Sequence, residues 1–225
     1  MPARLTPLET PAPDAIVTGD PRRAFALAGA LMEQPKMSHQ ARGLWGYTGI
    51  TASGMPLTVQ STGVGAPSAV AVVAGLAELG VRRLVRVGSC VAVPDLRSAG
   101  EILLIERAIG RDGVSRAIAT DAEAIVPDPE LRLLLEGAGW PAAVSSHDFV
   151  ARRDPRGPEP APGASARDLQ TAGVLALAAG NGLAGGAVLV VAGAGDERDL
   201  AEADLNPRMI EAAERVVERL ENSRL

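Results

Sequence analysis

The stretch Leu84-Val-Arg-Val-Gly-Ser-Cys-Val91 is an apolar run that carries one arginine inside it and ends in Gly-Ser before its last two residues. A run of Val and Leu is typical of a strand buried on both faces, as in the parallel sheets of α/β proteins. A guanidinium in such a strand is costly unless an anion meets it. Arg86 is therefore expected to be either half of a buried ion pair or a ligand for a bound anion.

An upstream segment has the pattern of a second strand followed by a helix. Ala15–Thr18 (AIVT) predicts a short strand, and Gly19-Asp20-Pro21 leads from it into a helix over Ala24–Met32. A helix start with Pro near its first turn exposes backbone N–H groups that can bind an anion, and Arg23 would add a charge-assisted contact. The alternative is an ordinary strand–helix turn with solvated arginines.

The segment between these two strands predicts a hairpin followed by a helix. Arg42–Ile50 (RGLWGYTGI) and Leu57–Ser61 (LTVQS) read as two strands, and the glycines of Thr62–Ser68 indicate close approach of a ligand or of another segment. Ser68 is a candidate N-cap for an apolar helix over Ala69–Leu79. Strand, helix and the opening strand in this order form a βαβ unit, which predicts parallel strands.

The second half of the chain continues the alternation of strands and helices. The expected strands are Glu101–Ala108, Ala142–Ser145 and Ala187–Ala192, and the expected helices are Leu131–Glu136, Asp168–Gly180 and Pro207–Leu220. Arg152–Ala166 is rich in proline, which blocks both helix and sheet, so it is either a mobile lid or a plain surface loop. No repeat or sharp boundary divides the chain, and a single α/β domain over residues 1–225 is expected.

The composition narrows the class of protein. Hydrophobic residues make up 47% of the chain and aromatic residues 2%, so the core is expected to consist of Ala, Val and Leu. The net charge of -5 argues against non-specific binding of nucleic acid. One cysteine allows no internal disulfide, and two histidines with it make no metal-ligand cluster. No membrane span or signal peptide is expected, and a cytoplasmic protein is predicted.

Four segments together resemble the purine nucleoside/uridine phosphorylase family. They are TGDPRR at 18–23, RGLWGYTGI at 42–50, STGVGAPS at 61–68 and VRVGSC at 85–90. The second and fourth are most similar to the bacterial hexameric purine enzymes. The resemblance implies a three-layer α/β/α fold with a central mixed sheet, and it favours the anion as the partner of Arg86.

The resemblance also implies roles for individual residues. The phosphate-binding residues would be Gly19, Arg23, Arg42, Arg86 and Ser89. The nucleoside-binding residues would be Gly63, Val64, Cys90, Val91, Phe149, Asp168, Leu169 and Gln170. Arg42 would reach the phosphate of a neighbouring subunit, which implies a homo-oligomer, either a dimer or a trimer of dimers. No cofactor or metal is implied, because inorganic phosphate is the co-substrate.

The chain departs from the family pattern at residues near the chemistry. Gln170 stands where the family has a ribose-binding carboxylate, and Val91 stands where it usually has glycine. Asp196 matches the catalytic acid of the purine enzymes only after a small shift in alignment; the alternative is a solvated acidic turn. Isolated histidines such as His39 and His147 are more often structural or solvated than catalytic.

The activity that the resemblance implies is phosphate-dependent cleavage of the N-glycosidic bond of a purine nucleoside, which yields the free base and a pentose 1-phosphate. Three alternatives remain open. The first is a uridine phosphorylase-type substrate, and the second is a nucleoside hydrolase that uses water. The third is a relative that binds a nucleoside or phosphate without turning it over.

Overall fold

A mixed sheet of nine strands forms the centre of the computed structural model, which describes residues 5–93, 95–120, 124–149, 159–194 and 199–223. The strands are β1 (Asp14–Thr18), β2 (Glu33–His39), β3 (Gly46–Ile50), β4 (Pro56–Ser61), β5 (Arg83–Ala92), β6 (Ile102–Gly110), β7 (Trp140–Ser146), β8 (Ala166–Asp168) and β9 (Ala184–Ala194). The helices are α1 (Pro21–Leu31), α2 (Gly65–Glu78), α3 (Gly113–Ile118), α4 (Pro129–Leu134), α5 (Thr171–Gly180) and α6 (Glu202–Asn222), with a 3-10 turn at Ala41–Gly43.

Strand β5, which contains the opening apolar run, organises the sheet. β9 pairs with it in parallel along its whole length, from Arg83 to Ala92. On the opposite edge, β1 pairs with residues 83–86 and β8 pairs with residues 91–92. On that edge, none of the strands that the structure describes pairs with residues 87–90. The strands β5–β8–β7–β6–β9 also form a closed circuit, because β9 pairs with both β6 and β5.

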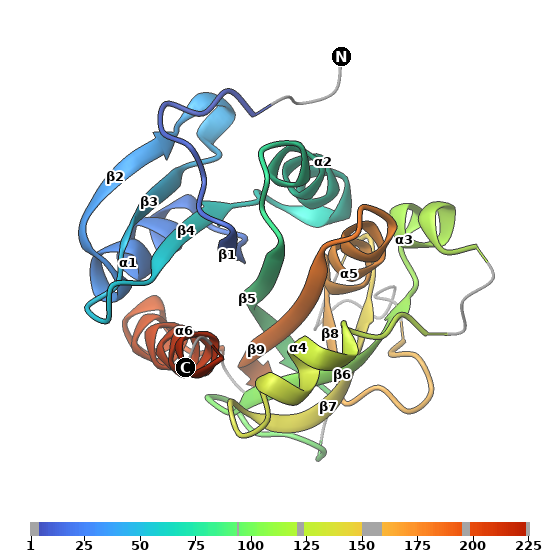
Figure 1. Ribbon diagram of the computed structural model, residues 1–225. Helices are drawn as coiled ribbons and strands as arrows, with labels where there is room; N and C mark the ends of the chain where they lie inside the picture. The colour runs from blue at the N-terminus through green and yellow to red at the C-terminus, as the bar shows by residue number, and fades with distance from the viewer. Residues whose placement is uncertain (1–4, 94, 121–123, 150–158, 195–198, 224–225) are drawn as a thin grey trace.

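Helices cover both faces of the sheet, as expected for an α/β fold. α1, α4 and α6 contribute side chains to one hydrophobic core, whereas α2 and α5 share a second core with β1 and β5. Figure 1 shows α2 and α5 side by side, away from α1 and α6. The strand order also refines the predicted βαβ unit: β4 and β5 are both parallel to β1, but β1 lies between them.

The start of α1 follows from its sequence. Asp20 is the N-cap, and its side chain accepts a hydrogen bond of 2.6 Å from the backbone N–H of Arg22. Pro21 occupies the first helical position, where no N–H is needed. The predicted strand–turn–helix is confirmed, and the helix begins three residues earlier than Ala24.

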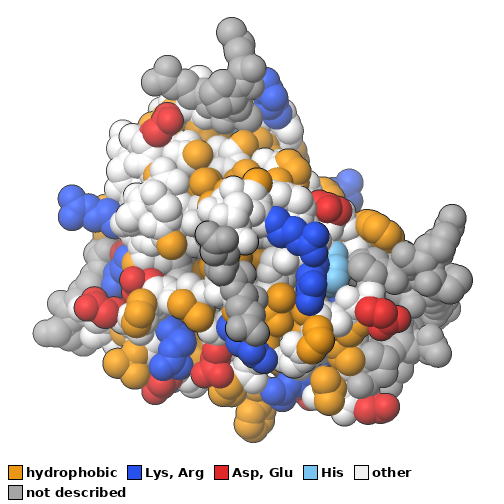
Figure 2. All heavy atoms as spheres, turned by 90° about the vertical axis from the view of Figure 1, so that its right-hand side faces the viewer, with side chains coloured by type: hydrophobic (Ala, Val, Ile, Leu, Met, Phe, Trp, Pro, Cys, Tyr) orange, Lys and Arg blue, Asp and Glu red, His pale blue; other side chains and the backbone are white. Residues whose placement is uncertain are grey.

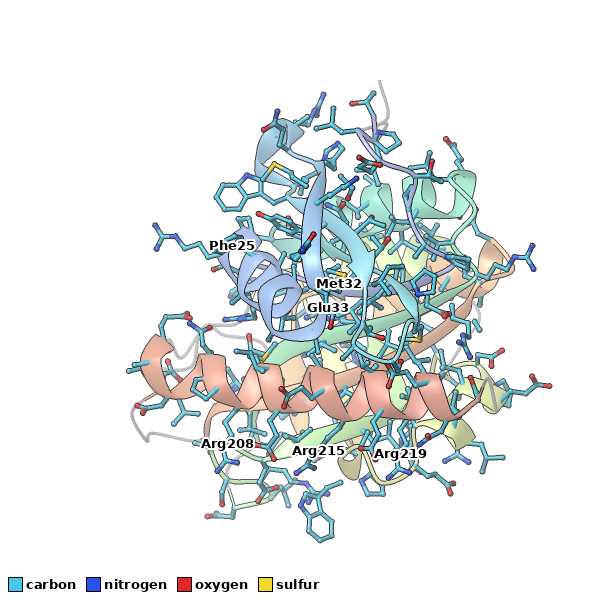
Figure 3. All side chains as sticks on the ribbon, turned by 60° about the vertical axis from the view of Figure 1, so that its left-hand side comes forward. Phe25, Met32, Glu33, Arg208, Arg215 and Arg219 are labelled. Carbon is cyan, nitrogen blue, oxygen red and sulfur yellow. The ribbon has the colours of Figure 1, made fainter. Side chains whose placement is uncertain are left out.

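α6 is longer than the sequence pattern indicated. It begins at Glu202, so Pro207 lies inside the helix instead of at its first turn. Arg208, Arg215 and Arg219 project from the side of α6 that faces away from α1 (Figure 3). Glu211 accepts hydrogen bonds from Arg208 and Arg215 at 2.8 and 2.6 Å, and these contacts lower the pKa of its carboxyl. The charged side chains on this face of α6 therefore form ion pairs within the helix.

Two local predictions in the first half are wrong. Residues 42–45 do not belong to a strand: Arg42 lies in a 3-10 turn with φ of 58°, and the strand begins at Gly46. α2 begins at Gly65 without a side-chain cap, because the Ser68 hydroxyl donates to the carbonyl of Thr62 instead.

The surface charges and the helices of the described residues can be compared with those of proteins that bind nucleic acid or cross a membrane. Across the face that Figure 2 shows, Lys and Arg side chains are interspersed with Asp, Glu and hydrophobic side chains. Within the described ranges, none of the helices combines the length and the apolar character that crossing a bilayer requires.

Candidate active site

A cavity of about 410 Å³ lies beside the part of β5 that has no neighbouring strand on one edge. Its lining comes from five segments: Gly19, Asp20, Pro21 and Arg23; Gly63, Val64 and Gly65; Arg86, Ser89, Cys90 and Val91; Arg167, Asp168, Leu169 and Gln170; and Ala192. The interrupted edge is a place where a ligand can reach the strand's own backbone.

Arg23 gives the cavity a positive end. It extends from the first turn of α1, and the residue is 8% exposed. Its Nε is buried and has no hydrogen-bond partner among the described residues. One Nη atom lies 3.7 Å from a carboxylate oxygen of Glu202, whose side chain is 69% exposed. A buried donor without a partner is costly, so this end of the cavity is suited to an anion.

Arg86 forms the buried ion pair that was one of its two expected roles. Its Nη2 donates to a carboxylate oxygen of Asp168 at 3.0 Å, and the two side chains are 5% and 1% exposed. Nη1 donates to Oε1 of Gln170 at 2.8 Å, and Nε donates to the hydroxyl of Thr171 at 3.1 Å. A guanidinium has five N–H donors, so these three bonds leave two for a ligand in the cavity. The anion role of Arg86 stays a prediction.

The Asp168 carboxylate is buried and hydrogen-bonded to other groups of the protein. It accepts hydrogen bonds from the hydroxyls of Ser146 and Thr171 at 2.5 and 2.6 Å. It also accepts from the backbone N–H of Thr171 at 3.0 Å, in addition to the bond from Arg86. Asp168 ends strand β8 and does not begin a helix, which corrects the predicted start of α5.

Gln170 connects three walls of the cavity. Its Oε1 accepts from Arg86 and from the hydroxyl of Thr62 at 3.1 Å. Its Nε2 donates to the carbonyls of Gly63 and Gly65 at 2.7 and 3.2 Å. Two donors on one side and two carbonyls on the other fix the orientation of the amide. The glycine turn is thereby tied to β5 and to the start of α5.

Most of the residues expected at the site from the sequence are brought together here. Gly19, Arg23, Gly63, Val64, Arg86 and Ser89 line the cavity, as do Cys90, Val91, Asp168, Leu169 and Gln170. Burial raises the pKa of the Cys90 thiol, which fits a small packing residue better than a nucleophile.

Two of the expected site residues lie away from the cavity, and the structure does not describe a third. The described lining does not include Phe149, which is 53% exposed. Arg42 is exposed and does not line this subunit's cavity. Asp196 lies outside the described residues, and so do residues 152–158 of the expected lid.

Both histidines have structural contacts. His39 is buried, and its Nδ1–H donates to the carbonyl of Leu44 at 2.6 Å, which holds the turn that carries Arg42. His147 is buried, and its Nε2 lies 3.0 Å from the hydroxyl of Ser145. Burial and the nearby Arg167 lower the pKa of His147. Neither histidine lines the cavity.

Sequence reasoning missed part of the lining. Arg167 and Ala192 both border the cavity. A shift in the pairing of β9 with β5 falls at Ala192, since Cys90 pairs with Val191 and Val91 pairs with Gly193. Such a bulge redirects a side chain, and no sequence pattern marks it here. Arg167 could have been noticed as a cation next to the Asp168–Gln170 segment.

The arrangement has the groups needed to hold an anion beside an uncharged organic molecule. Arg23 and Arg86 line the cavity together with the small or apolar residues Gly63, Cys90, Val91 and Leu169. Within the described ranges, no group of three or more His, Cys, Asp or Glu residues could hold a metal ion.

Comparison with known proteins assigns the chain to a family. The chain is 36% identical over 104 residues to a DeoD-type purine nucleoside phosphorylase of Oceanobacillus iheyensis, which covers 46% of this chain and 44% of that protein. It is 33% identical over 135 residues to a uridine phosphorylase of Escherichia coli, which covers 59% and 52%. These matches span only about half of each relative.

The fold has a counterpart among solved structures. A purine nucleoside phosphorylase from Toxoplasma gondii, in complex with immucillin-H, superposes with a TM-score of 0.84 at 21% identity. The superposition covers 95% of this chain and 93% of that one, which confirms the predicted fold class. The model of the phosphorylase superfamily matches residues 13–222, and the chain therefore belongs to that superfamily.

Proposed function

We propose that the protein is a nucleoside phosphorylase that cleaves the N-glycosidic bond of a purine nucleoside with inorganic phosphate. The observation that carries this proposal is Arg23, an arginine in the cavity lining whose buried Nε has no hydrogen-bond partner among the described residues. Phosphate bound there would accept from Arg23, from the free N–H groups of Arg86 and from Ser89 and the turn at Gly19. No cofactor takes part in this reaction.

The proposed reaction follows from this placement. A phosphate oxygen forms a bond to C1′ of the pentose while the bond from C1′ to the base nitrogen breaks and its electron pair leaves with the base. The arginines orient the phosphate and stabilise its charge, which lowers the barrier. The base gains a proton as it departs, and Asp196 is the proposed donor. Val64, Cys90, Val91 and Leu169 would border the nucleoside.

We also propose that the working form is a homo-oligomer. Arg42 is exposed on a turn held by His39 and does not line its own cavity, so it is free to complete the site of a neighbouring subunit. Mixing Arg42→Ala subunits with Arg86→Met subunits tests this arrangement. Each variant alone should be weakly active, whereas mixed oligomers should regain activity at the sites that combine an intact Arg42 with an intact Arg86. Mixtures no more active than the separate variants would contradict the shared site.

The decisive assay measures base release from a panel of purine and pyrimidine nucleosides, with and without phosphate. Phosphate-dependent release together with pentose 1-phosphate supports the proposal and ranks the substrates. Phosphate-independent release would identify a hydrolase. Arg23→Met should raise the KM for phosphate by about tenfold or more, because it removes a charge-assisted hydrogen bond.

Binding without turnover is the second candidate function. The observation that favours it is that Asp168 and Gln170, the two acceptors beside Arg86, are hydrogen-bonded to other groups of the protein. In that case no nucleoside in the panel would release its base, while phosphate or a nucleoside would still raise the melting temperature.

A further inference from the structure

Gln170 is bonded in a way that only an amide can satisfy. Its Nε2 faces two backbone carbonyls, those of Gly63 and Gly65, and its Oε1 faces two donors, Arg86 and Thr62. A carboxylate at this position would place an oxygen against the two carbonyls, which repel it. The residue is 3% exposed, so water cannot relieve that repulsion.

The hydrogen-bonding capacity of this amide is used within the protein. The two amide hydrogens are donated to the carbonyls of Gly63 and Gly65, and the amide oxygen accepts from Arg86. The Thr62 hydroxyl, which has one proton, lies 3.1 Å from both this oxygen and the carbonyl oxygen of Thr18.

The neighbouring Asp168 is also bonded within the protein: Arg86 and the hydroxyl and N–H of Thr171 donate to its Oδ2, and the hydroxyl of Ser146 donates to its Oδ1. The two acceptor side chains beside Arg86 are therefore bonded within the protein and belong to residues that are each 3% exposed, which leaves them little capacity to accept from a ligand hydroxyl.

The pentose must lie close to these two side chains if the proposed function holds. Phosphate attacks C1′, so the adjacent C2′ and the next carbon, C3′, lie within a few bonds of the anion site that includes Arg86. Hydroxyls on those carbons would normally be recognised by acceptors at this end of the cavity.

We propose that Gln170 is a positioning residue that clamps the glycine turn to β5, and that the cavity consequently does not select for the 2′- and 3′-hydroxyls of its substrate. This inference rests on the proposed nucleoside function and deepens it. It predicts that the protein recognises its substrates by the base and by the carbon that the phosphate attacks, and not by the 2′- and 3′-hydroxyls. Ribonucleosides, 2′-deoxynucleosides and 2′,3′-dideoxynucleosides should bind with similar affinity.

The test compares inosine, 2′-deoxyinosine and 2′,3′-dideoxyinosine by calorimetry in phosphate buffer, together with phosphate-dependent cleavage of each. A hydrogen bond to a charged acceptor changes affinity by about tenfold or more, so the expected differences lie below about tenfold. Inosine that binds at least about tenfold more tightly than its dideoxy analogue would overturn the inference, and so would a protein that binds none of the three. Equal binding without cleavage would leave the inference standing and refute the phosphorylase.

Gln170→Glu and Gln60→Glu form a matched pair of variants. Gln60 is also buried, and its Nε2 also donates to two carbonyls, those of Leu44 and Ser61, but it does not line the cavity. Both variants should have a lower melting temperature. Only Gln170→Glu should free an acceptor in the cavity and raise the preference for inosine over dideoxyinosine, by about tenfold or more. An unchanged preference in Gln170→Glu, or an equal change in Gln60→Glu, would refute the assignment to Gln170.

Discussion

Replacing Asp168 by Asn should separate the two roles of Arg86. The substitution keeps the shape of the side chain but removes the charge that neutralises a guanidinium whose side chain is 5% exposed. Breaking a buried ion pair by removing one partner costs about 3–5 kcal/mol, because an unpaired charge stays buried. In a chain of 225 residues, that loss lowers the melting temperature by about 6–20 °C.

Phosphate should partly rescue this variant. A dianion in the cavity would supply the negative charge that the substitution removes, so phosphate should stabilise Asp168→Asn more than the natural protein. A ligand at about 100 times its Kd contributes about 2.7 kcal/mol, which urea unfolding with and without phosphate can resolve.

Asp14→Asn is the matched control for this experiment. Asp14 pairs with Arg83 at 2.6 Å, but the Arg83 side chain is 25% exposed and can be hydrated when the pair is broken. Asp14→Asn should lower the free energy of unfolding by less than Asp168→Asn does, and phosphate should not restore the stability of Asp14→Asn. The reasoning is refuted if Asp168→Asn loses less than about 1 kcal/mol, the net value of an ordinary hydrogen bond, or if phosphate stabilises both proteins equally.

Three further outcomes are expected. Gly63→Ala should lower the free energy of unfolding by about 1–2 kcal/mol or more, measured in urea, because φ is +72° and the new Cβ would lie 2.6 Å from the Ser68 hydroxyl oxygen. Gly88→Ala should displace the Arg86 guanidinium, which lies 2.6–2.9 Å from the new Cβ, and raise the phosphate KM by about tenfold. Cys90 should resist thiol reagents in the folded protein and react in urea, because burial raises its pKa and disfavours the thiolate.

The chain offers controls for these substitutions. Gly54→Ala shares the positive φ of Gly63, at +88°, but its Cβ meets nothing within 4 Å, so it isolates backbone strain from the clash. Gly113→Ala likewise meets nothing within 4 Å and should leave the phosphate KM unchanged. A Gly88→Ala protein with an unchanged phosphate KM would contradict the placement of Arg86 at the anion site. Rapid labelling of folded Cys90 would contradict its burial.

The sequence was sufficient for the buried strands and for the location of the cavity. β5 and β9 are apolar along most of their length, and the glycine-containing turns that follow β1 and β4 bring Gly19 and Gly63 to the site. β2 was missed because EQPKMSH contains Pro35 and mostly exposed residues, as an edge strand can. β8 was missed because three residues give no periodicity.

The contacts within the site could not be read from the sequence. Arg86 and Asp168 are 82 positions apart, and only the pairing of β8 with the end of β5 brings them together. The role of Gln170 likewise depends on carbonyls more than 100 positions away. A local pattern states that a buried arginine needs an anion, but it does not state which one.

Because one edge of β5 is unpaired at residues 87–90 among the described strands, hydrogen exchange in this strand should show whether a ligand occupies the cavity. Successive backbone amides in a strand point to opposite edges, so within residues 87–90 one set faces β9 and the other faces the side where neither β1 nor β8 pairs. Hydrogen exchange at the first set should follow the global opening of the sheet. Exchange at the second set should slow when a ligand covers that edge. The exchange rates of two neighbouring amides in β5 would then report two different quantities, the free energy of unfolding and the occupancy of the cavity.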